Sequence, residues 1–413
     1  MNMTPQAMPP RVVILTPYFR PIVGGVESNA ERLTRYFSSI GFRVTVLTKR
    51  LTRDLPDLEP LDGARVVRIG PRGPRSPGGK WWMLPAVTSW LVKHRDDYDV
   101  VSSIDCRGVG LGALAARFVT RHPVIAQPQT TGVLAPDGTQ GPLGSALKMA
   151  LGSLYGRADA IACIARTIER EALSRHIPQD RVHYLPNAID MTRFRPPTPR
   201  ERAGARRHFR VGDDVIACAF VGRLSREKGV MDLMDAWRLL AAGAPQPVDS
   251  ARATGRGARL IVAGPDMKGH AWDAGAEARA FVARHGLQGS VQFVGPIADV
   301  PALMHAADIV VQPSHFEALG LSAVEALACG VPVVACAVGG LVDFVVDDVN
   351  GRTCQPHRAD ELAACLKSLI EEPVRRARLA GAARSSVERQ YDEQVVFSQF
   401  AELVRALADR RSQ

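Results

Sequence analysis

The sequence predicts an α/β protein built from two similar halves, each with a parallel sheet covered by helices. Short apolar runs of strand length alternate with helix-like segments through the first half, and the same alternation restarts after a basic, proline-rich break near Arg193. The chain has 413 residues, enough for two or three domains of ordinary size. We therefore expect an N-terminal domain over residues 1–193 and a C-terminal domain over residues 194–390.

In the first half, strands are expected where apolar runs end in turn residues. The first run, Arg11 to Pro17, leads into a glycine-rich turn and a helix-like segment that closes at Gly41. The segment FRVTVLT alternates as a strand. Further strands are expected at Ala64–Ile69, Asp99–Ser103, Pro123–Gln127, Asp159–Ile164 and Val182–Leu185.

The second half repeats this pattern and ends in an amphipathic helix. Its expected strands are DVIACAFVG, ARLIVAG, VQFVG, DIVVQPS and VPVVACA. Helices are expected at about Gly229–Ala241, Ala274–His285, Leu319–Ala328 and Asp360–Glu371. Residues 391–413 carry apolar side chains at helical spacing, so this last helix needs an apolar surface to pack on.

Composition and charge narrow the class of protein and of partner. Hydrophobic residues make up 46% and charged residues 23%, as in soluble globular proteins. The net charge of +10 favours an anionic partner, although solubility alone would also explain it. Among anionic partners we expect nucleotide phosphates and leave open peripheral contact with an anionic membrane, to which Trp81, Trp82 and Met83 could contribute an interfacial anchor; we expect no nucleic acid.

The cysteines and the termini favour a cytoplasmic location. The seven cysteines are scattered without a CxxC pair and mostly lie in apolar runs, so reduced core thiols are expected rather than disulfides or a metal site. The N-terminus lacks the apolar stretch of a signal peptide, and the sequence holds no run of about 18 apolar residues.

The strongest functional signal is the segment QPSHFEALGLSAVEALACG. An apolar strand ends in a loop that carries Glu317, and a helix opens near Gly320 and carries Glu325. A helix N-terminus after a parallel strand binds anions, because its N–H groups and dipole point at the ligand. Glu325 could then reach a ribose diol and Glu317 a sugar, although two ordinary glutamates would give the same pattern.

A second signal is FVGRLSREKGV, where a strand ends in a short basic loop. Arg223 and Lys228 could neutralise a diphosphate leaving group, with Arg226 a weaker candidate. A solvated basic loop is the plain alternative. Gly24 and Gly25 form a third signal, because glycines after the first strand let the backbone approach a ligand. That turn lacks the GxGxxG fingerprint, which disfavours an NAD-dependent enzyme.

One acidic pair suggests a metal but is not assigned to one. Asp97-Tyr98-Asp99 spells DxD, a pattern of metal-dependent transferases, yet it opens a predicted strand, where short acidic clusters are common. We therefore expect no metal and no cofactor.

Taken in order, VGRLSREKG, PSHFEALGLSAVEALACGVPVVA, PNAIDMTRF and VNGRTCQP resemble the motifs of glycosyltransferase family 4, retaining enzymes of the GT-B fold. The resemblance covers the whole chain. It implies two Rossmann-like domains that face a central cleft, with the last helix crossing back to the N-terminal domain. It also implies transfer of a sugar from a nucleotide-diphosphate donor to a glycan, lipid-linked or small-molecule acceptor.

The resemblance also implies a role for each candidate site residue. Arg223 and Lys228 match the family's diphosphate-binding pair, Glu325 its ribose ligand and Glu317 its glutamate near the donor sugar. Other donor contacts would come from the backbone of Ala318, Leu319, Gly320 and Leu321 and from the phosphate-side loop with Gly24 and Gly25.

The sequence departs from the family at one catalytic position. Many members carry a histidine at the end of the fifth strand, and Gln129 stands at about that place. Glutamine cannot titrate, but it can donate a hydrogen bond to a sugar oxygen. Two alternatives therefore stay open: a non-catalytic nucleotide-sugar or membrane-surface binding protein, and a nucleotide-sugar epimerase of the same fold.

Overall fold

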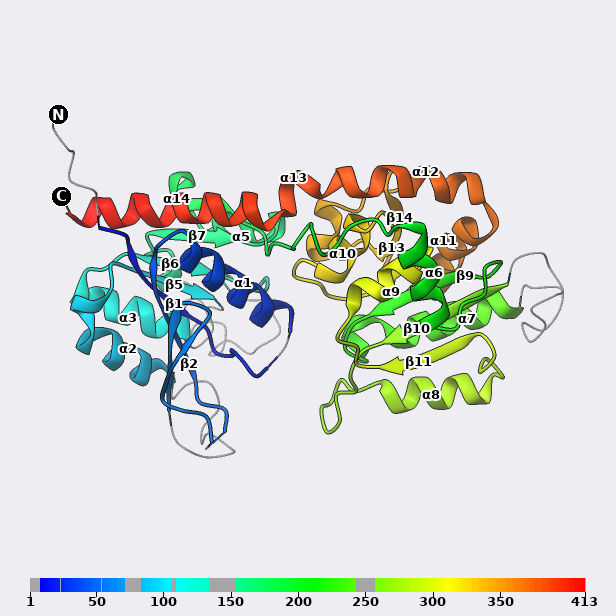
Figure 1. The fold of residues 1–413 in the computed structure, drawn as a ribbon, viewed down its shortest axis with the longest axis horizontal. Helices are drawn as coiled ribbons and strands as arrows, with labels where there is room; N and C mark the ends of the chain where they lie inside the picture. Colours follow the sequence, from blue (N-terminus) through cyan, green and yellow to red (C-terminus); the bar gives the residue numbers. More distant parts are fainter. Residues whose placement is uncertain are drawn as a thin grey trace. The chain divides into compact units, whose positions relative to one another are not determined.

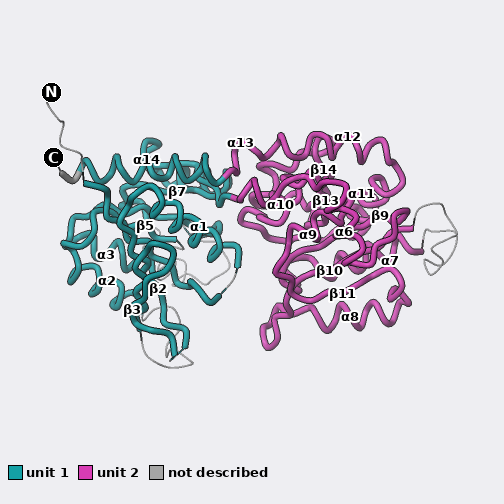
Figure 2. Tube along the Cα trace, in the orientation of Figure 1, with its two compact units in different colours: residues 1–188, 393–413 teal, residues 189–392 magenta. Residues whose placement is uncertain are grey.

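A computed structural model describes residues 8–22, 24–52, 54–70, 83–104, 109–133, 153–242 and 257–412. The chain divides into two compact units: residues 1–188 together with 393–413, and residues 189–392 (Figure 2). The expected surface loop at Gly243–Gly257 lies almost wholly outside the described residues, as do Trp81 and Trp82.

Unit 1 is built on a sheet of eight described strands in the order β3-β4-β2-β1-β5-β6-β7-β8. Strand β3 runs antiparallel to β4, and the other neighbouring pairs are parallel. The strands are β1 (Arg11–Leu15), β2 (Arg43–Lys49), β3 (Leu58–Leu61), β4 (Ala64–Ile69), β5 (Val100–Ile104), β6 (Val124–Gln127), β7 (Ala160–Cys163) and β8 (Val182–Tyr184). The central strands are buried along most of their length, as expected for a sheet covered on both faces.

Helices of unit 1 follow most of these strands (Figure 1). They are α1 (Gly25–Ser39), α2 (Met83–Lys93), α3 (Leu111–Thr120), α5 (Arg166–Ser174) and α14 (Glu393–Ser412), with short 3-10 turns η1 (Arg95–Asp97) and η3 (Gln179–Arg181). None of the helices in the described part of the chain has the length and apolarity needed to cross a membrane.

The last helix, α14, belongs to unit 1 and packs beside α1 (Figure 1). The Phe397 ring lies 5.7 Å from that of Tyr36, and the Phe400 ring lies 5.8 Å from that of Phe37. Arg32 of α1 also forms an ion pair with Glu393 at 3.2 Å. These contacts supply the apolar surface that the stripe on this helix requires, and they confirm that the C-terminal helix returns to the N-terminal domain.

Unit 2 holds a parallel sheet of six described strands in the order β11-β10-β9-β12-β13-β14. The strands are β9 (Ile216–Val221), β10 (Ala258–Ala263), β11 (Val291–Gly295), β12 (Ile309–Gln312), β13 (Val333–Cys336) and β14 (Gly351–Cys354). The helices are α6 (Pro199–His208), α7 (Val230–Ala242), α8 (Gly275–Arg284), α9 (Val300–Ala306), α10 (Leu321–Ala328), α11 (Ala359–Glu371), α12 (Pro373–Ala383) and α13 (Glu388–Tyr391), with short 3-10 turns η4 (Arg226–Lys228), η5 (Gly339–Asp343) and η6 (Arg384–Ser386).

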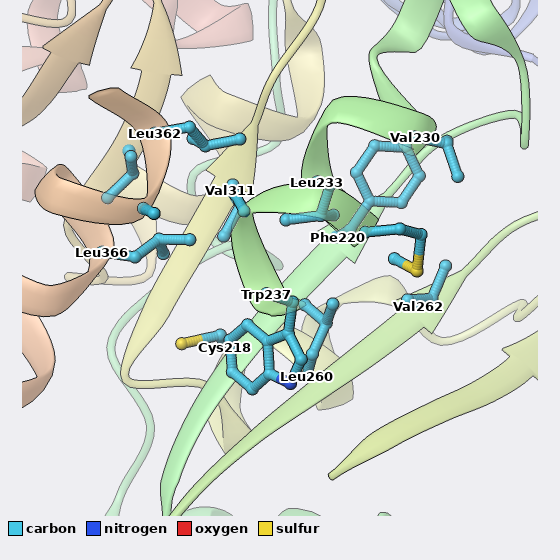
Figure 3. Close-up of a cluster of buried hydrophobic side chains, with 14 of the residues drawn as sticks. Cys218, Phe220, Val230, Leu233, Trp237, Leu260, Val262, Val311, Leu362 and Leu366 are labelled. Atoms are coloured by element: carbon cyan, nitrogen blue, oxygen red, sulfur yellow. The ribbon is translucent and has the colours of Figure 1, made fainter. Parts of the chain in front are cut away.

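The core of unit 2 lies between this sheet and its helices (Figure 3). Phe220 of β9, Leu260 of β10 and Trp237 of α7 are among its buried side chains. The Trp237 Nε1–H donates to Ser290 Oγ at 3.1 Å, so the one polar atom of the indole is satisfied inside an apolar cluster. This core fixes α7 and the loop before it, which carries Arg223 and Lys228.

Six of the seven cysteines lie in the described part of the chain, where all six are buried free thiols. Burial raises the pKa of the Cys163 and Cys329 thiols to about 12. Such thiols stay protonated near neutral pH, which fits the expectation of reduced, unreactive core cysteines.

Candidate functional site

The candidate residues of each unit gather at the carboxyl ends of its parallel strands, where α/β sheets bind ligands. In unit 2, Arg223 follows β9 and Glu317 follows β12. In unit 1, the segment with Gly24 follows β1, and Gln129 follows β6.

Glu317 lies in the loop after β12 and is held by three donors. Its Oε2 accepts from Lys228 Nζ at 2.6 Å, from Gln312 Nε2 at 3.1 Å and from Ser314 Oγ at 3.1 Å. Ser322 Oγ donates to Gln312 Oε1 at 2.7 Å, which orients the Gln312 amide so that its nitrogen faces the carboxylate. Glu317 is only 9% exposed, so these charge-assisted bonds hold it in one position.

The backbone around Glu317 requires glycine at two positions, Gly339 and Gly320. Gly339 has φ +53°, and a Cβ there would lie 1.6 Å from the Glu317 carbonyl oxygen. The next residue, Gly340, donates its N–H to that same oxygen at 3.2 Å. Gly320 has φ +93°, and a Cβ there would lie 2.5 Å from Leu341 Cδ2. This close packing therefore fixes the position of the Glu317 backbone and of the first turn of α10.

Helix α10 presents its N-terminus directly after that loop. Gly320 occupies the N-cap position and has no side chain to cap the first turn. The sequence predicted a helix start at this place, and the structure confirms it. The structure also places Glu325 on α10, partly exposed, and places Ala318 and Leu319 just before the helix. An uncapped N-terminus of this kind can receive an anion.

The basic loop after β9 is fastened to the Glu317 loop. Gly229 ends it with φ +68°, and a Cβ there would meet the Pro313 carbonyl oxygen at 1.8 Å. The His315 N–H donates to the Glu227 carbonyl at 2.9 Å. Arg223 is about half exposed and pairs with Glu227 at 2.8 Å. The two loops therefore pair Lys228 with Glu317, while Arg223, in the same basic loop, pairs with Glu227.

Arg226, the weaker candidate of this loop, is engaged differently. Its guanidinium pairs with Glu277 on α8. This pair gives Arg226 a structural partner, whereas Lys228 pairs with the candidate site residue Glu317.

In unit 1, Gly24 and Gly25 open α1. Gly24 is extended at the N-cap, and its carbonyl accepts from the Ser28 N–H at 2.9 Å. A Cβ on Gly24 would lie 2.3 Å from Glu27 Oε2, so the carboxylate of the first turn folds over this glycine. Gly25 is the first residue of the helix, where backbone N–H groups point out of the helix end.

Gln129 ends a chain of amide hydrogen bonds that the sequence did not predict. The Ala188 N–H donates to Asn29 Oδ1 at 3.1 Å, and Asn29 Nδ2 donates to Asn187 Oδ1 at 3.0 Å. Asn187 Nδ2 then donates to Gln129 Oε1 at 2.9 Å.

A backbone N–H can only donate, so this first bond fixes the orientation of every amide in the chain. The Gln129 oxygen is thereby committed to Asn187, and its Nε2 is a donor whose contact with the Gln127 carbonyl is long, at 3.4 Å. Gln129 is therefore oriented to offer N–H.

The DxD pair, Asp97 and Asp99, lies before the amino-terminal end of β5, whereas Gly24 and Gln129 follow the carboxyl ends of β1 and β6. Asp99 directly precedes β5, and its carboxylate accepts from Arg11 Nη2 at 2.7 Å and from the Arg11 backbone N–H at 2.8 Å. Asp97 lies 3.0 Å from His94 Nδ1. Asp99 thus fastens β5 to β1 at the amino-terminal edge of the sheet.

The arginine-rich segment after Arg193 could also contact anionic lipid, but two of its arginines, like Met83 of the expected interfacial anchor, are engaged within the fold. Arg202 and Arg206 of α6 both pair with Asp308, at 2.6 and 3.1 Å. Met83 is buried at the start of α2. Arg200, Arg207 and Arg210 remain exposed on or beside α6.

Unit 2 also brings together three side chains with metal-ligating atoms, a group that the sequence did not predict. Asp232, His315 and His357 each offer one ligand atom, and these atoms lie within 4.8 Å of one another. The sequence spacing gave no signal because the three residues come from three different strand-end loops or helices.

Comparison with known proteins identifies the family. Residues 23–193 match the model described as Glycosyltransferase Family 4, and residues 205–386 match the model described as Glycosyl transferases group 1. The D-inositol 3-phosphate glycosyltransferase of Xylanimonas cellulosilytica is 31% identical over 414 residues, which cover 92% of this chain and 93% of that relative. This chain belongs to glycosyltransferase family 4.

A second family 4 relative and two solved structures agree with this assignment. D-inositol 3-phosphate glycosyltransferase 1 of Catenulispora acidiphila is 30% identical, covering 85% of this chain and 84% of its own. Sucrose-phosphate synthase from Thermosynechococcus elongatus has a TM-score of 0.78 at 22% identity, covering 96% of this chain and 99% of its own. Anabaena HepE in complex with UDP-glucose has a TM-score of 0.74 at 22% identity, covering 96% and 100%. The two structures confirm the GT-B fold with its two Rossmann-like domains.

Proposed function

We propose that this family 4 enzyme moves a sugar from a nucleotide-diphosphate donor to an acceptor hydroxyl with retention of the anomeric configuration. The observation that carries the proposal is the group of Arg223, Lys228 and Glu317 beside the N-terminus of α10. Two cations and a helix start suit a diphosphate, and the fixed carboxylate suits sugar hydroxyls. HepE, a structural neighbour, was solved with UDP-glucose, which supports a nucleotide-sugar donor.

Arg223, Lys228 and the α10 N-terminus would stabilise the leaving group. As the C1–O bond loosens, negative charge builds on the diphosphate, and these groups bind that charge more strongly in the transition state than in the ground state. Lys228 would then be shared between Glu317 and a phosphate. Glu325 would accept from both ribose hydroxyls, and the backbone from Ala318 to Leu321 with Gly24 and Gly25 would contact the sugar and phosphates.

Gln129 would donate its Nε2–H to an oxygen of the bound sugar. The chain of amides through Asn29 and Asn187 supports this, because it commits the Gln129 oxygen and leaves the nitrogen as the donor. In this role the glutamine needs no proton transfer, which fits a side chain that cannot titrate. The acceptor hydroxyl would attack from the face that the leaving group occupies, and the leaving phosphate would take its proton.

We further propose that this transfer step uses no divalent metal, since Arg223, Lys228 and the α10 N-terminus would together meet the charge of the leaving group. The acceptor is proposed to be a glycan, a lipid-linked sugar or a small molecule. The family relatives named for D-inositol 3-phosphate make a phosphorylated cyclitol a sensible first acceptor to test. The buried free thiols support a cytoplasmic enzyme, and the net charge of +10 and the exposed arginines near α6 support peripheral contact with anionic membranes.

A thermal-shift panel of nucleotides and nucleotide sugars tests the donor part of the proposal. A ligand that binds the native state stabilises it by mass action, so the correct donor should raise Tm of the wild type. Arg223→Ala should reduce that shift, and Arg226→Ala, in the same loop but paired with Glu277, is the matched control. An identical shift in wild type and in Arg223→Ala would refute the placement of the diphosphate.

A further inference from the structure

Three side chains with metal-binding chemistry converge beside the candidate donor site in unit 2. Asp232 lies in the first turn of α7, His315 in the loop after β12 and His357 after β14. His315 Nε2 lies 2.8 Å from Asp232 Oδ2, and the rings of His315 and His357 have centroids 3.7 Å apart. The sheet topology therefore brings together residues from three separate segments at one edge.

His357 adopts a backbone conformation that residues other than glycine seldom adopt. Its φ is +61°, in the left-handed region, where a non-glycine residue carries a cost. This conformation places an exposed imidazole directly against His315, which is about four-fifths buried. Because His357 is exposed and the His315 and Asp232 side chains are each about one-fifth exposed, an ion can reach the cluster from solvent.

We propose that Asp232, His315 and His357 bind one transition-metal ion of the Zn²⁺, Co²⁺ or Ni²⁺ type. Two imidazoles and one carboxylate are the ligands that these ions favour, whereas Mg²⁺ and Mn²⁺ favour sets made of oxygen. Three protein ligands leave at least one position for water. The ion would replace the hydrogen bond between His315 and Asp232.

The geometry requires only a modest adjustment. Bonds of about 2.0–2.2 Å in a tetrahedral site place ligand atoms about 3.4 Å apart. The present ligand atoms lie within 4.8 Å of one another, and the exposed His357 side chain can rotate to close that gap.

Binding would tie the Glu317 loop to its surroundings. His315 stands two residues before Glu317, and its N–H already bonds to the loop that carries Lys228. An ion shared with Asp232 and His357 would link this loop to α7 and to the segment after β14. The ion would thus act as a brace for the loop and would take no part in the transfer step.

Titration of the metal-stripped, full-length protein with Co²⁺ tests this inference independently of any sugar transfer. We expect one equivalent to bind with a visible d–d absorption band, and Zn²⁺ to displace it and raise Tm by a few degrees. His357→Ala and Asp232→Asn should lose the band and the Tm shift. His285→Ala removes an exposed histidine at the end of α8 and should bind like wild type.

The outcomes separate the two interpretations of this cluster. Circular dichroism should show that His357→Ala is folded, since its side chain is exposed. Saturable binding that His357→Ala abolishes supports the metal site. Absence of saturable binding below about 0.1 mM, or equal binding by wild type and His357→Ala, would overturn it and leave an ordinary His–Asp hydrogen bond.

Discussion

Asn187 donates a 2.9 Å hydrogen bond from Nδ2 to Gln129 Oε1. This bond ends a sequence of amide contacts that begins at the Ala188 N–H, whose direction cannot reverse. The Gln129 side chain is therefore held with its nitrogen as the available donor. A glutamine at this position can then recognise a substrate oxygen with a defined polarity, without any change of protonation.

The donor role of Gln129 predicts opposite results for two substitutions. Gln129→Glu replaces the Nε2 donor by an oxygen and places it beside substrate oxygens, so kcat/KM should fall about tenfold or more. Gln129→His can still donate and should keep most of the activity. Steady-state kinetics of both variants checks this, and a Gln129→Glu enzyme as active as wild type would contradict it.

Substitutions in the basic loop after β9 should lower nucleotide affinity selectively. Arg223→Ala and Lys228→Ala should each weaken binding of the nucleoside diphosphate by roughly 1.5–3 kcal/mol, or about 10- to 150-fold in Kd, because each removes a charged hydrogen bond. Arg226→Ala should change Kd little. Calorimetric titration measures all three, and unchanged Kd values for Arg223→Ala and Lys228→Ala would count against the assignment.

The free energy of unfolding should fall more in Lys228→Ala than in Arg223→Ala. Lys228→Ala leaves the buried carboxylate of Glu317 without its cation, which should lower the free energy of unfolding by roughly 3 kcal/mol. Arg223→Ala removes an exposed ion pair with Glu227 and should cost less than about 1 kcal/mol. Urea denaturation of both variants tests the difference. Equal midpoints would show that the Lys228–Glu317 pair contributes no more to stability than the exposed Arg223–Glu227 pair.

Glu325 is predicted to recognise the ribose of the donor. Glu325→Gln should keep the fold and raise the donor KM, because a neutral amide makes weaker hydrogen bonds to two adjacent hydroxyls than a carboxylate does. A donor that lacks both ribose hydroxyls should bind wild type and variant almost equally. If Glu325→Gln still prefers the ribose donor as strongly as wild type, the glutamate is structural.

The transfer step is predicted to proceed without Mg²⁺ or Mn²⁺. Treatment with a chelator should leave kcat at saturating donor nearly unchanged, since Arg223, Lys228 and the α10 N-terminus are proposed to neutralise the charge of the leaving group. Activity that vanishes with chelator and returns with Mg²⁺ or Mn²⁺ would contradict this and direct attention back to Asp97 and Asp99.

Much of the fold could be predicted because periodicity is strong in most elements. Buried runs such as RVVIL and IACAFV form β1 and β9, as their patterns indicate. Two strands escaped prediction. Strand β3 (LEPL) carries a proline and lies at the sheet edge, and β14 (GRTC) has little apolar character of its own.

The sequence likewise predicts one part of the candidate site and misses another. Contiguous motifs place Arg223, Lys228 and Glu317 after strands of one parallel sheet, and the ends of such strands share one edge. Asn29 and Asn187 are 158 residues apart, and their amide contact depends on how α1 packs against the segment after β8. The Asp232–His315 contact likewise spans 83 residues. Neither leaves a signal in local spacing.

Sugar transfer with retention of the anomeric configuration can be followed by proton NMR of the reaction mixture. Wild-type enzyme would be supplied with the donor that gives the largest Tm shift and with acceptors that include a phosphorylated cyclitol. We expect release of nucleoside diphosphate and a product whose anomeric centre has the configuration of the donor sugar. A donor that binds but is never consumed, or a product of inverted configuration, would contradict it.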